Sequence, residues 1–164
     1  MNNIFFKALF IVIIFFQYNC KAQTVNDYVT FYNDIVPKLN TLAPTKIQFY
    51  GQDFSNFHNE LLNKNINIVH LSYDYKIHPS TKYYVLYLFF EDSGMWSVAS
   101  ANTFQYPWIS ITFENEIPSQ IKNMVLQSQG KWDSNFAQFF SNMKIDKIKF
   151  IGVNGYDNND WTGK

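Results

Sequence analysis

The stretch KYYVLYLFFE, residues 82–91, decides the fold of this chain. Between its charged end residues every side chain is apolar or aromatic, whichever face of an extended strand it would occupy. A strand that is apolar on both faces is typical of the middle of a sheet. Turn-forming residues stand on either side, His78-Pro79-Ser80 before it and Asp92-Ser93-Gly94 after it. The sequence therefore predicts a central strand that a turn precedes and a turn follows.

Further strands are predicted on both sides of this one, over residues 67–77, 96–102 and 108–114. The segments that separate them are too short for the helical crossovers that parallel strands need, so we expect an antiparallel meander. Two shorter stretches, KIQFY at 46–50 and KIKFIGV at 147–153, also have strand character. Together these strands predict a largely antiparallel sheet of about five to six strands.

Apolar residues at helical spacing predict four helices, over residues 24–42, 53–64, 118–130 and 133–143. We expect Thr24 or Asn26 to cap the first helix, Pro37 to kink or divide it, and Asn65 to end the second in a left-handed conformation. The order of elements is then α-β-α-β-β-β-β-α-α-β. This order is typical of an α+β fold with helices packed on one face of the sheet.

We expect this order to build one domain over residues 23–153, because no repeat or Pro/Gly-rich linker divides it. The remaining residues, 154–164, are polar and are expected to form a loose tail.

Residues 1–22 resemble a secretory signal in outline. Lys7 is followed by an unbroken apolar run over residues 8–16, which is too short to span a membrane. Cleavage after Ala22 is one expected ending, and lipid attachment at Cys20 is the other. Lipoprotein signals usually carry an aliphatic residue three positions before the cysteine and a small one just before it. Gln17 and Asn19 stand there, so we favour cleavage after Ala22. The expected location is periplasmic, tethered to the outer membrane, or secreted.

Charge and cysteine content limit the partners of the expected mature chain. Beyond residue 22 there are 11 lysines and 13 acidic residues, a formal charge of −2, and no arginine or cysteine. A domain of this charge is not expected to bind nucleic acid, and a membrane is expected as a partner only through a lipid on Cys20. Since Cys20 is the one cysteine of the sequence, the core must hold without an internal disulfide.

The sequence HLSYD, residues 70–74, is the strongest candidate for chemistry. Strand periodicity places His70, Ser72 and Asp74 on one face, but neighbours on that face stand about 7 Å apart, too far for a catalytic triad. We interpret them as the polar solvent face of a half-buried strand. His58 and His78 have no partner at metal-ligand spacing, and the acidic residues of the tail do not fit a calcium loop. No catalytic residue, metal or cofactor is therefore predicted.

Trp96 and Trp108 stand at the starts of predicted strands, where their rings could line a groove or cover the core. With His70 they are the candidate ligand-binding residues. The hypothesis favoured by the sequence is an exported, non-catalytic protein that binds a protein, peptide or glycan. The alternative is a small hydrolase whose site only the fold assembles. Convergence of His70 with Glu91, Glu114 or His58 in a deep pocket would favour the hydrolase, and a shallow, convex His70 face would favour binding.

Overall fold

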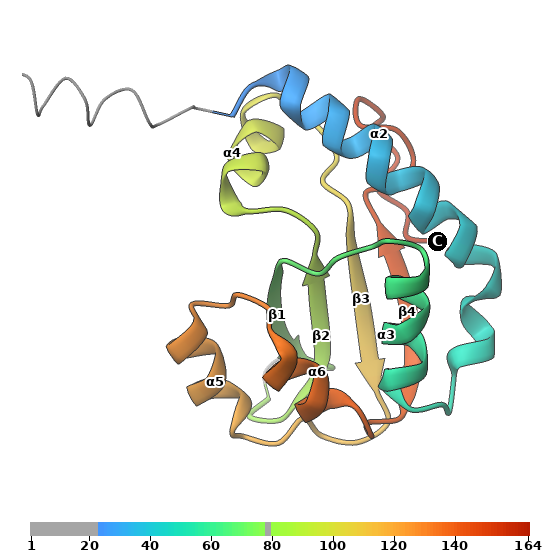
Figure 1. The fold of residues 1–164 in the computed structure, drawn as a ribbon, viewed down its shortest axis with the longest axis vertical. Helices are drawn as coiled ribbons and strands as arrows, with labels where there is room; N and C mark the ends of the chain where they lie inside the picture. The colour runs from blue at the N-terminus through green and yellow to red at the C-terminus, as the bar shows by residue number, and fades with distance from the viewer. Residues whose placement is uncertain (1–22, 78–79) are drawn as a thin grey trace, which may run out of the picture.

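The stretch 82–91 contains strand β2 (Tyr83–Phe89) in the computed structural model, which describes residues 23–77 and 80–164. β2 lies between β1 (His70–Tyr75) and β3 (Trp108–Phe113), and β4 (Ile145–Ile151) pairs with the other side of β3. All neighbouring strands are antiparallel, in the order β1-β2-β3-β4 (Figure 1). The central place of this stretch and the antiparallel pairing of the strands are confirmed, but the predicted meander is wrong at 96–102, where a helix joins β2 to β3. The expected signal segment with Cys20, and His78, lie outside the described residues.

Within the described residues the sheet is open and has four strands, and five α-helices and one 3-10 helix accompany it in a single α+β domain. The helices are α2 (Val25–Leu42), η1 (Ala43–Phe49), α3 (Phe54–Asn63), α4 (Ser93–Ala101), α5 (Ile121–Ser128) and α6 (Ser134–Phe140). The prediction of five or six strands is thus wrong in number, because 46–50 and 96–102 are helical. None of the described helices has the length and apolarity that crossing a membrane requires.

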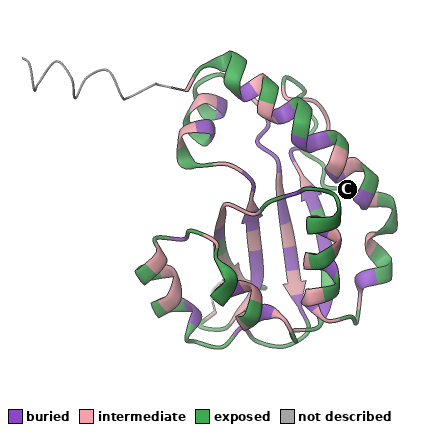
Figure 2. Ribbon diagram, in the orientation of Figure 1, coloured by how far each residue is buried: buried purple, intermediate pink, exposed green. Residues whose placement is uncertain are grey.

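The two faces of the sheet differ in burial, because buried and less buried residues alternate along the strands (Figure 2). One cross-strand row joins Leu71, Leu88, Ile109 and Phe150, all of them buried. In Figure 1, α3 and α6 lie in front of the sheet. The rings of Phe54 on α3 and Phe140 on α6 pack on the ring of Phe113 on β3. The centroid of Phe113 lies 6.1 Å from that of Phe54 and 5.6 Å from that of Phe140, and the Phe54 and Phe140 centroids are 5.9 Å apart. On the opposite face, the neighbouring row of His70, Phe89, Trp108 and Ile151 is only partly buried.

Helix α2 begins where the sequence predicts. The Thr24 hydroxyl accepts from the backbone N–H of Asp27, and the Asp27 carboxylate accepts from the Thr24 N–H in return. This capping box satisfies two N–H groups that the first turn would otherwise leave free. Pro37 lies inside the helix but does not divide it.

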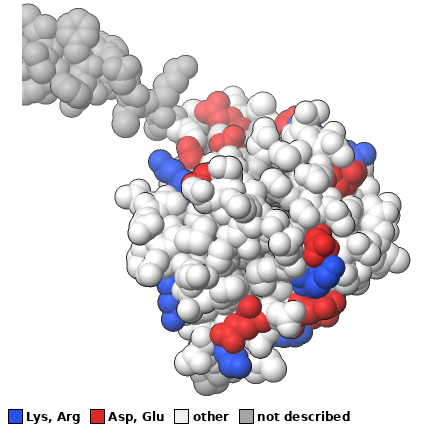
Figure 3. Space-filling view, turned by 60° about the horizontal axis from the view of Figure 1, so that its bottom comes forward, with Lys and Arg blue, Asp and Glu red and all other residues white. Residues whose placement is uncertain are grey.

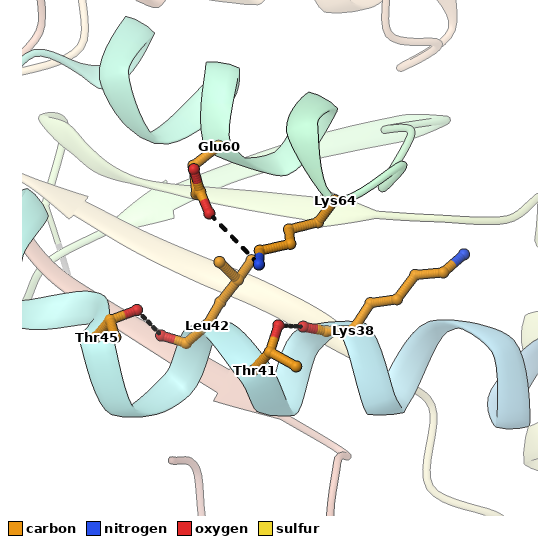
Figure 4. A network of polar contacts seen from close by, with 6 residues as sticks. All are labelled: Lys38, Thr41, Leu42, Thr45, Glu60 and Lys64. Carbon is orange, nitrogen blue, oxygen red and sulfur yellow. Dashed lines mark hydrogen bonds and ion pairs between the residues drawn. The ribbon is translucent and has the colours of Figure 1, made fainter.

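The expected strand at 46–50 is instead part of the 3-10 helix η1. α2 passes into η1 at Pro44, which has no N–H to continue the α-helical ladder. Figure 4 shows the Thr41 and Thr45 hydroxyls donating back to the carbonyl oxygens of Lys38 and Leu42, at 2.7 and 3.1 Å. It also shows Lys64 reaching back along α3 to Glu60, at 4.0 Å. The hydroxyl contacts and the proline keep this segment in tight helical turns.

Helix α4 replaces the strand expected at 96–102. The Asp92 carboxylate accepts from the N–H groups of Gly94 and Met95 at 2.9 and 3.4 Å, so the expected turn at 92–94 is in fact a helix cap. The helix ends at Asn102, and Thr103 takes a left-handed φ of 57°. Asn65, with φ of 54°, ends α3 in the same region, as predicted.

Residues 154–164 differ from the expected loose tail. The backbone of Lys164 pairs with that of Phe150 in β4, at 3.0 and 2.9 Å. The fully buried side chain of Gln105 donates through Nε2 to the carbonyl oxygens of Asn158 and Asp160, both at 2.7 Å. Asn154 Nδ2 donates to the carbonyl oxygens of Asp160 and Thr162, both at 2.9 Å. These bonds hold the segment against the domain.

Candidate functional site

A cleft of about 1110 Å³ lies on the partly covered face, where β2 ends and β3 begins. Its walls come from β1, β2, α4, β3 and the connecting segments, and they bring together His70, Trp96 and Trp108, the three candidate residues from the sequence. The lining residues are Gln23, His70, Tyr87, Phe89, Glu91, Asp92, Ser93, Gly94, Trp96, Tyr106, Trp108, Gln129 and Lys131.

Strand pairing builds the floor of the cleft. His70 on β1 pairs with Phe89 on β2, and Phe89 pairs with Trp108 on β3. Tyr87 stands two residues before Phe89 and therefore points to the same face. The floor is thus a continuous row of rings that crosses three strands.

Helix α4 builds one wall. The Asp92 cap starts the helix directly after β2, so that Trp96 lies over the end of the sheet with 51% of its surface exposed. Its ring meets the buried Tyr106 ring edge-on at 5.4 Å. The Tyr106 hydroxyl donates to the carbonyl oxygen of Glu91 at 3.3 Å, which ties the start of β3 to the end of β2. Burial, followed by the charges of Glu91 and Asp92, raises the Tyr106 pKa.

The carboxylate of Asp92 is held at the rim of the cleft. Gln23 Nε2 donates to its Oδ1 at 2.9 Å. This hydrogen bond is the main cause that lowers the Asp92 pKa below its usual value; burial opposes it, and the Gly94 and Met95 N–H groups and His70 add to it. Asp92 therefore stays ionised while it fixes both the first turn of α4 and the side chain of Gln23.

His70 is oriented by the backbone beside it. Its Nδ1 lies 3.2 Å from the carbonyl oxygen of Gly130, and because a carbonyl can only accept, this contact is a hydrogen bond when Nδ1 carries a proton. The Leu71 N–H donates to the same carbonyl at 2.8 Å, and the Trp132 N–H donates to Val69 at 2.9 Å. The segment that carries Lys131 therefore occupies the outer edge of β1 beside the cleft.

The cleft does not contain a triad built from HLSYD. Strand register places His70, Ser72 and Asp74 on one face, but no hydrogen bond joins any two of them in the described structure. Asp74 instead accepts from the Tyr87 hydroxyl at 3.3 Å and from the backbone N–H of Tyr75 at 2.7 Å. The serine that lines the cleft, Ser93, has no hydrogen bond to His70 either.

Of the three residues that could have converged with His70, Glu91 lines the cleft, whereas Glu114 and His58 do not. His58 lies on α3 against the rings of Phe54 and Trp132, at 5.8 and 5.6 Å. Burial there lowers the His58 pKa. The described residues include no group of three or more histidine, cysteine, aspartate or glutamate side chains that could hold a metal ion.

Several lining residues were not singled out from the sequence, among them Tyr87, Phe89, Tyr106 and Lys131. The alternation in 82–91 puts Tyr87 and Phe89 on one face, which was a usable signal. Tyr106 and Lys131 reach the cleft through loop contacts, for which the sequence gives no comparable signal.

The surface charges of the molecule are mixed in sign. On the face in Figure 3, acidic and basic side chains lie near one another, and broad uncharged areas separate the charged groups.

Comparison with known proteins shows no family. No family model matches the chain, and no solved structure matches it. Over 59 residues, 36% of this chain, it is 37% identical to the Retrograde protein of 51 kDa of Lymnaea stagnalis. Over 59 residues it is also 36% identical to a Non-neuronal cytoplasmic intermediate filament protein of Cornu aspersum. These matches cover 13% and 10% of the two proteins, so the chain spans roughly a tenth of the length of the curated relatives that it matches.

Proposed function

We propose that this protein is an exported, non-catalytic protein that binds a glycan in the cleft on the sheet face opposite α3 and α6. The observation that carries the proposal is the half-exposed Trp96 ring standing over a floor that contains Phe89 and Trp108. Exposed aromatic surface of this kind, rimmed by polar groups, marks binding sites on soluble proteins.

The lining suits a sugar. One face of a sugar ring consists of C–H bonds, which pack on the flat surface of a tryptophan, while its hydroxyl groups need donors and acceptors around the edge. Glu91, Gln129 and Lys131 line the same cleft and supply both. The cleft therefore combines flat apolar surface with dispersed polar atoms, as a glycan requires.

The cleft suits a peptide less well. Extended peptides are commonly bound by adding a strand to an open sheet edge. Beside the cleft, the edge of β1 is already bonded to the segment around Lys131. A peptide would have to be held by side-chain contacts alone, and this favours the glycan.

A hydrolase is the second candidate. It is favoured by one observation, that the carbonyl oxygen of Gly130 orients the His70 ring through Nδ1 in a cleft that Glu91 also lines. Against it, among the described residues neither Ser72 nor Ser93 is hydrogen-bonded to His70, so His70 does not activate either serine.

Binding to a panel of neutral and anionic oligosaccharides, measured by calorimetry, tests the proposal. Trp96→Ala should weaken binding at least about tenfold, the loss expected when a central aromatic contact is removed. Trp96→Phe should keep part of the affinity, and Leu126→Ala, which truncates an exposed apolar residue on α5, should keep all of it. Ester turnover that disappears in His70→Ala, with the fold preserved by circular dichroism, would instead establish the hydrolase.

The proposal of export is tested separately by the intact mass of the native protein. A species that begins at Gln23, or at Cys20 with added acyl mass, supports export. A mature species that retains residues 1–16 would contradict it.

A further inference from the structure

A second, smaller cleft of about 310 Å³ adjoins the first. The two share the rings of Trp96 and Tyr106, so this edge-on pair stands between them. Trp161, from the segment that the sequence predicts to be loose, also lines the second cleft. The lining residues of the second cleft are Trp96, Ala99, Ser100, Thr103, Phe104, Tyr106, Asn159 and Trp161.

The placement of Trp161 is built into the fold. The carbonyl oxygens of Asp160 and Thr162, on either side of it, both accept from Asn154 Nδ2 at 2.9 Å, and Asp160 also accepts from the buried Gln105. Residue Trp161 is nevertheless 46% exposed, and its ring centroid lies 6.5 Å from that of Trp108. The backbone of a surface tryptophan is thus fixed on both sides, although its ring is not part of the core.

The chemistry of the second cleft differs from that of the first. The first is lined by the ionisable side chains of His70, Glu91, Asp92 and Lys131. The described residues that line the second carry no charged side chain, and they combine aromatic rings with the hydroxyl and amide groups of Ser100, Thr103 and Asn159. A charged ligand would lose its hydration here without gaining an ion pair, whereas an uncharged polyhydroxyl group would find stacking surface and hydrogen-bond partners.

We propose that the two clefts form one continuous groove for a chain of uncharged sugar units, and that Trp161 stacks on a unit beyond Trp96. The inference rests on the proposed glycan binding and extends it from the first cleft to a further sugar unit in the second. The volume of the second cleft lies at the lower end of the range of about 300 to 1,000 Å³ that is usual for small-ligand sites. A short branch or one further unit fits this size better than a second large ligand.

The experiment measures affinity against chain length. Calorimetric titrations use gluco-, manno- and xylo-oligosaccharides from the disaccharide to the hexasaccharide. In the unmodified protein the longer chains should bind about tenfold more tightly than the disaccharide. Trp161→Ala should abolish this gain and leave disaccharide affinity unchanged, and Trp161→Phe should restore most of it.

A matched pair of serine variants tests the same point without removing a ring. Ser100→Glu places a charge in the second cleft and should also abolish the gain, whereas Ser97→Glu, on the same helix but outside both clefts, should not. If the gain with length persists in Trp161→Ala and Ser100→Glu while Trp96→Ala abolishes binding, the continuous groove is overturned and glycan binding stands. If no oligosaccharide binds to the unmodified protein, both proposals are overturned.

Discussion

Replacing Gln105 by alanine tests whether one buried amide fastens residues 154–164 to the domain. Its Nε2 donates two hydrogen bonds of 2.7 Å, and its Oε1 accepts a longer one of 3.4 Å from the Asn154 N–H. A hydrogen bond contributes about 1 kcal/mol net, and a buried polar group that loses its partner costs about 1 to 3 kcal/mol. Losing two strong hydrogen bonds should therefore lower the free energy of unfolding by about 2 to 4 kcal/mol. The measured loss cannot exceed the free energy that holds residues 154–164 against the domain.

Urea denaturation followed by circular dichroism measures the global loss, and hydrogen exchange measures opening of residues 154–164. Gln105→Glu keeps the size of the side chain but turns its two donated bonds into contacts between oxygens, so it should destabilise the protein at least as much. Gln127→Ala, on the exposed side of α5, should change stability by less than about 0.5 kcal/mol. A Gln105→Ala protein with unchanged exchange in the segment and a loss below about 0.5 kcal/mol would refute the reasoning.

Three further substitutions test the core, the backbone and the pH response. Leu86→Ala, at a fully buried position of β2, should cost about 2 to 5 kcal/mol in urea denaturation, and a loss under about 0.5 kcal/mol would show that the strand is peripheral. Gly152→Ala should destabilise the protein far more than Gly51→Ala in the same assay. Both glycines have φ near 70°, so both substitutions strain the backbone. An added Cβ at Gly152 would also lie 2.1 Å from the Tyr106 carbonyl oxygen, whereas at Gly51 the nearest atom is 3.9 Å away. Equal losses in the free energy of unfolding would mean that the positive φ alone, and not the contact with Tyr106, sets the cost of the substitution. Burial lowers the pKa of His58 in the folded protein below its usual 6.5. The contribution of neutral His58 to the free energy of unfolding is therefore fully present above pH 6.5, and it is lost as the pH falls through the pKa of the folded state. His58→Phe should flatten the dependence of the free energy of unfolding on pH below pH 6.5. An unchanged dependence would show that other groups cause it.

The parts of the fold that the sequence predicts correctly are those that local pattern determines. The apolar run of β2 specifies a central strand, and the Thr24 cap specifies where α2 begins. The prediction of a strand over residues 96–102 is wrong because Asp92 followed by serine and glycine is equally suited to a turn and to a helix cap. The prediction of a strand over residues 46–50 is wrong because Pro44 and the Thr41 and Thr45 hydroxyls, which stand outside that short stretch, favour tight helical turns there.

The candidate site could be predicted only in part. His70, Trp96 and Trp108 were suggested by residue type, but nothing local shows that they meet. His70 and Trp108 come together through strand register across β2, and Trp96 joins them only because α4 is a helix. Trp161 depends on Gln105, which lies more than fifty residues earlier in the chain.

The contacts of α2 carry a consequence for the timing of folding. Its Tyr32 hydroxyl donates to the carbonyl oxygen of Gly152 and accepts from the N–H of Gly155, each at 2.9 Å, with sequence separations of 120 and 123 residues. A ribosome adds about 5 to 20 residues per second, so the helix would be made roughly 6 to 25 s before these partners exist. Through that interval Tyr28 and Phe31 can already pack on Phe104 and Tyr106, which come earlier in the chain, but the Tyr32 hydroxyl lacks both of its partners. A chain cut before Gly152 would therefore keep the contacts of α2 with Phe104 and Tyr106 but lose the two hydrogen bonds that fasten Tyr32 to residues 152–155.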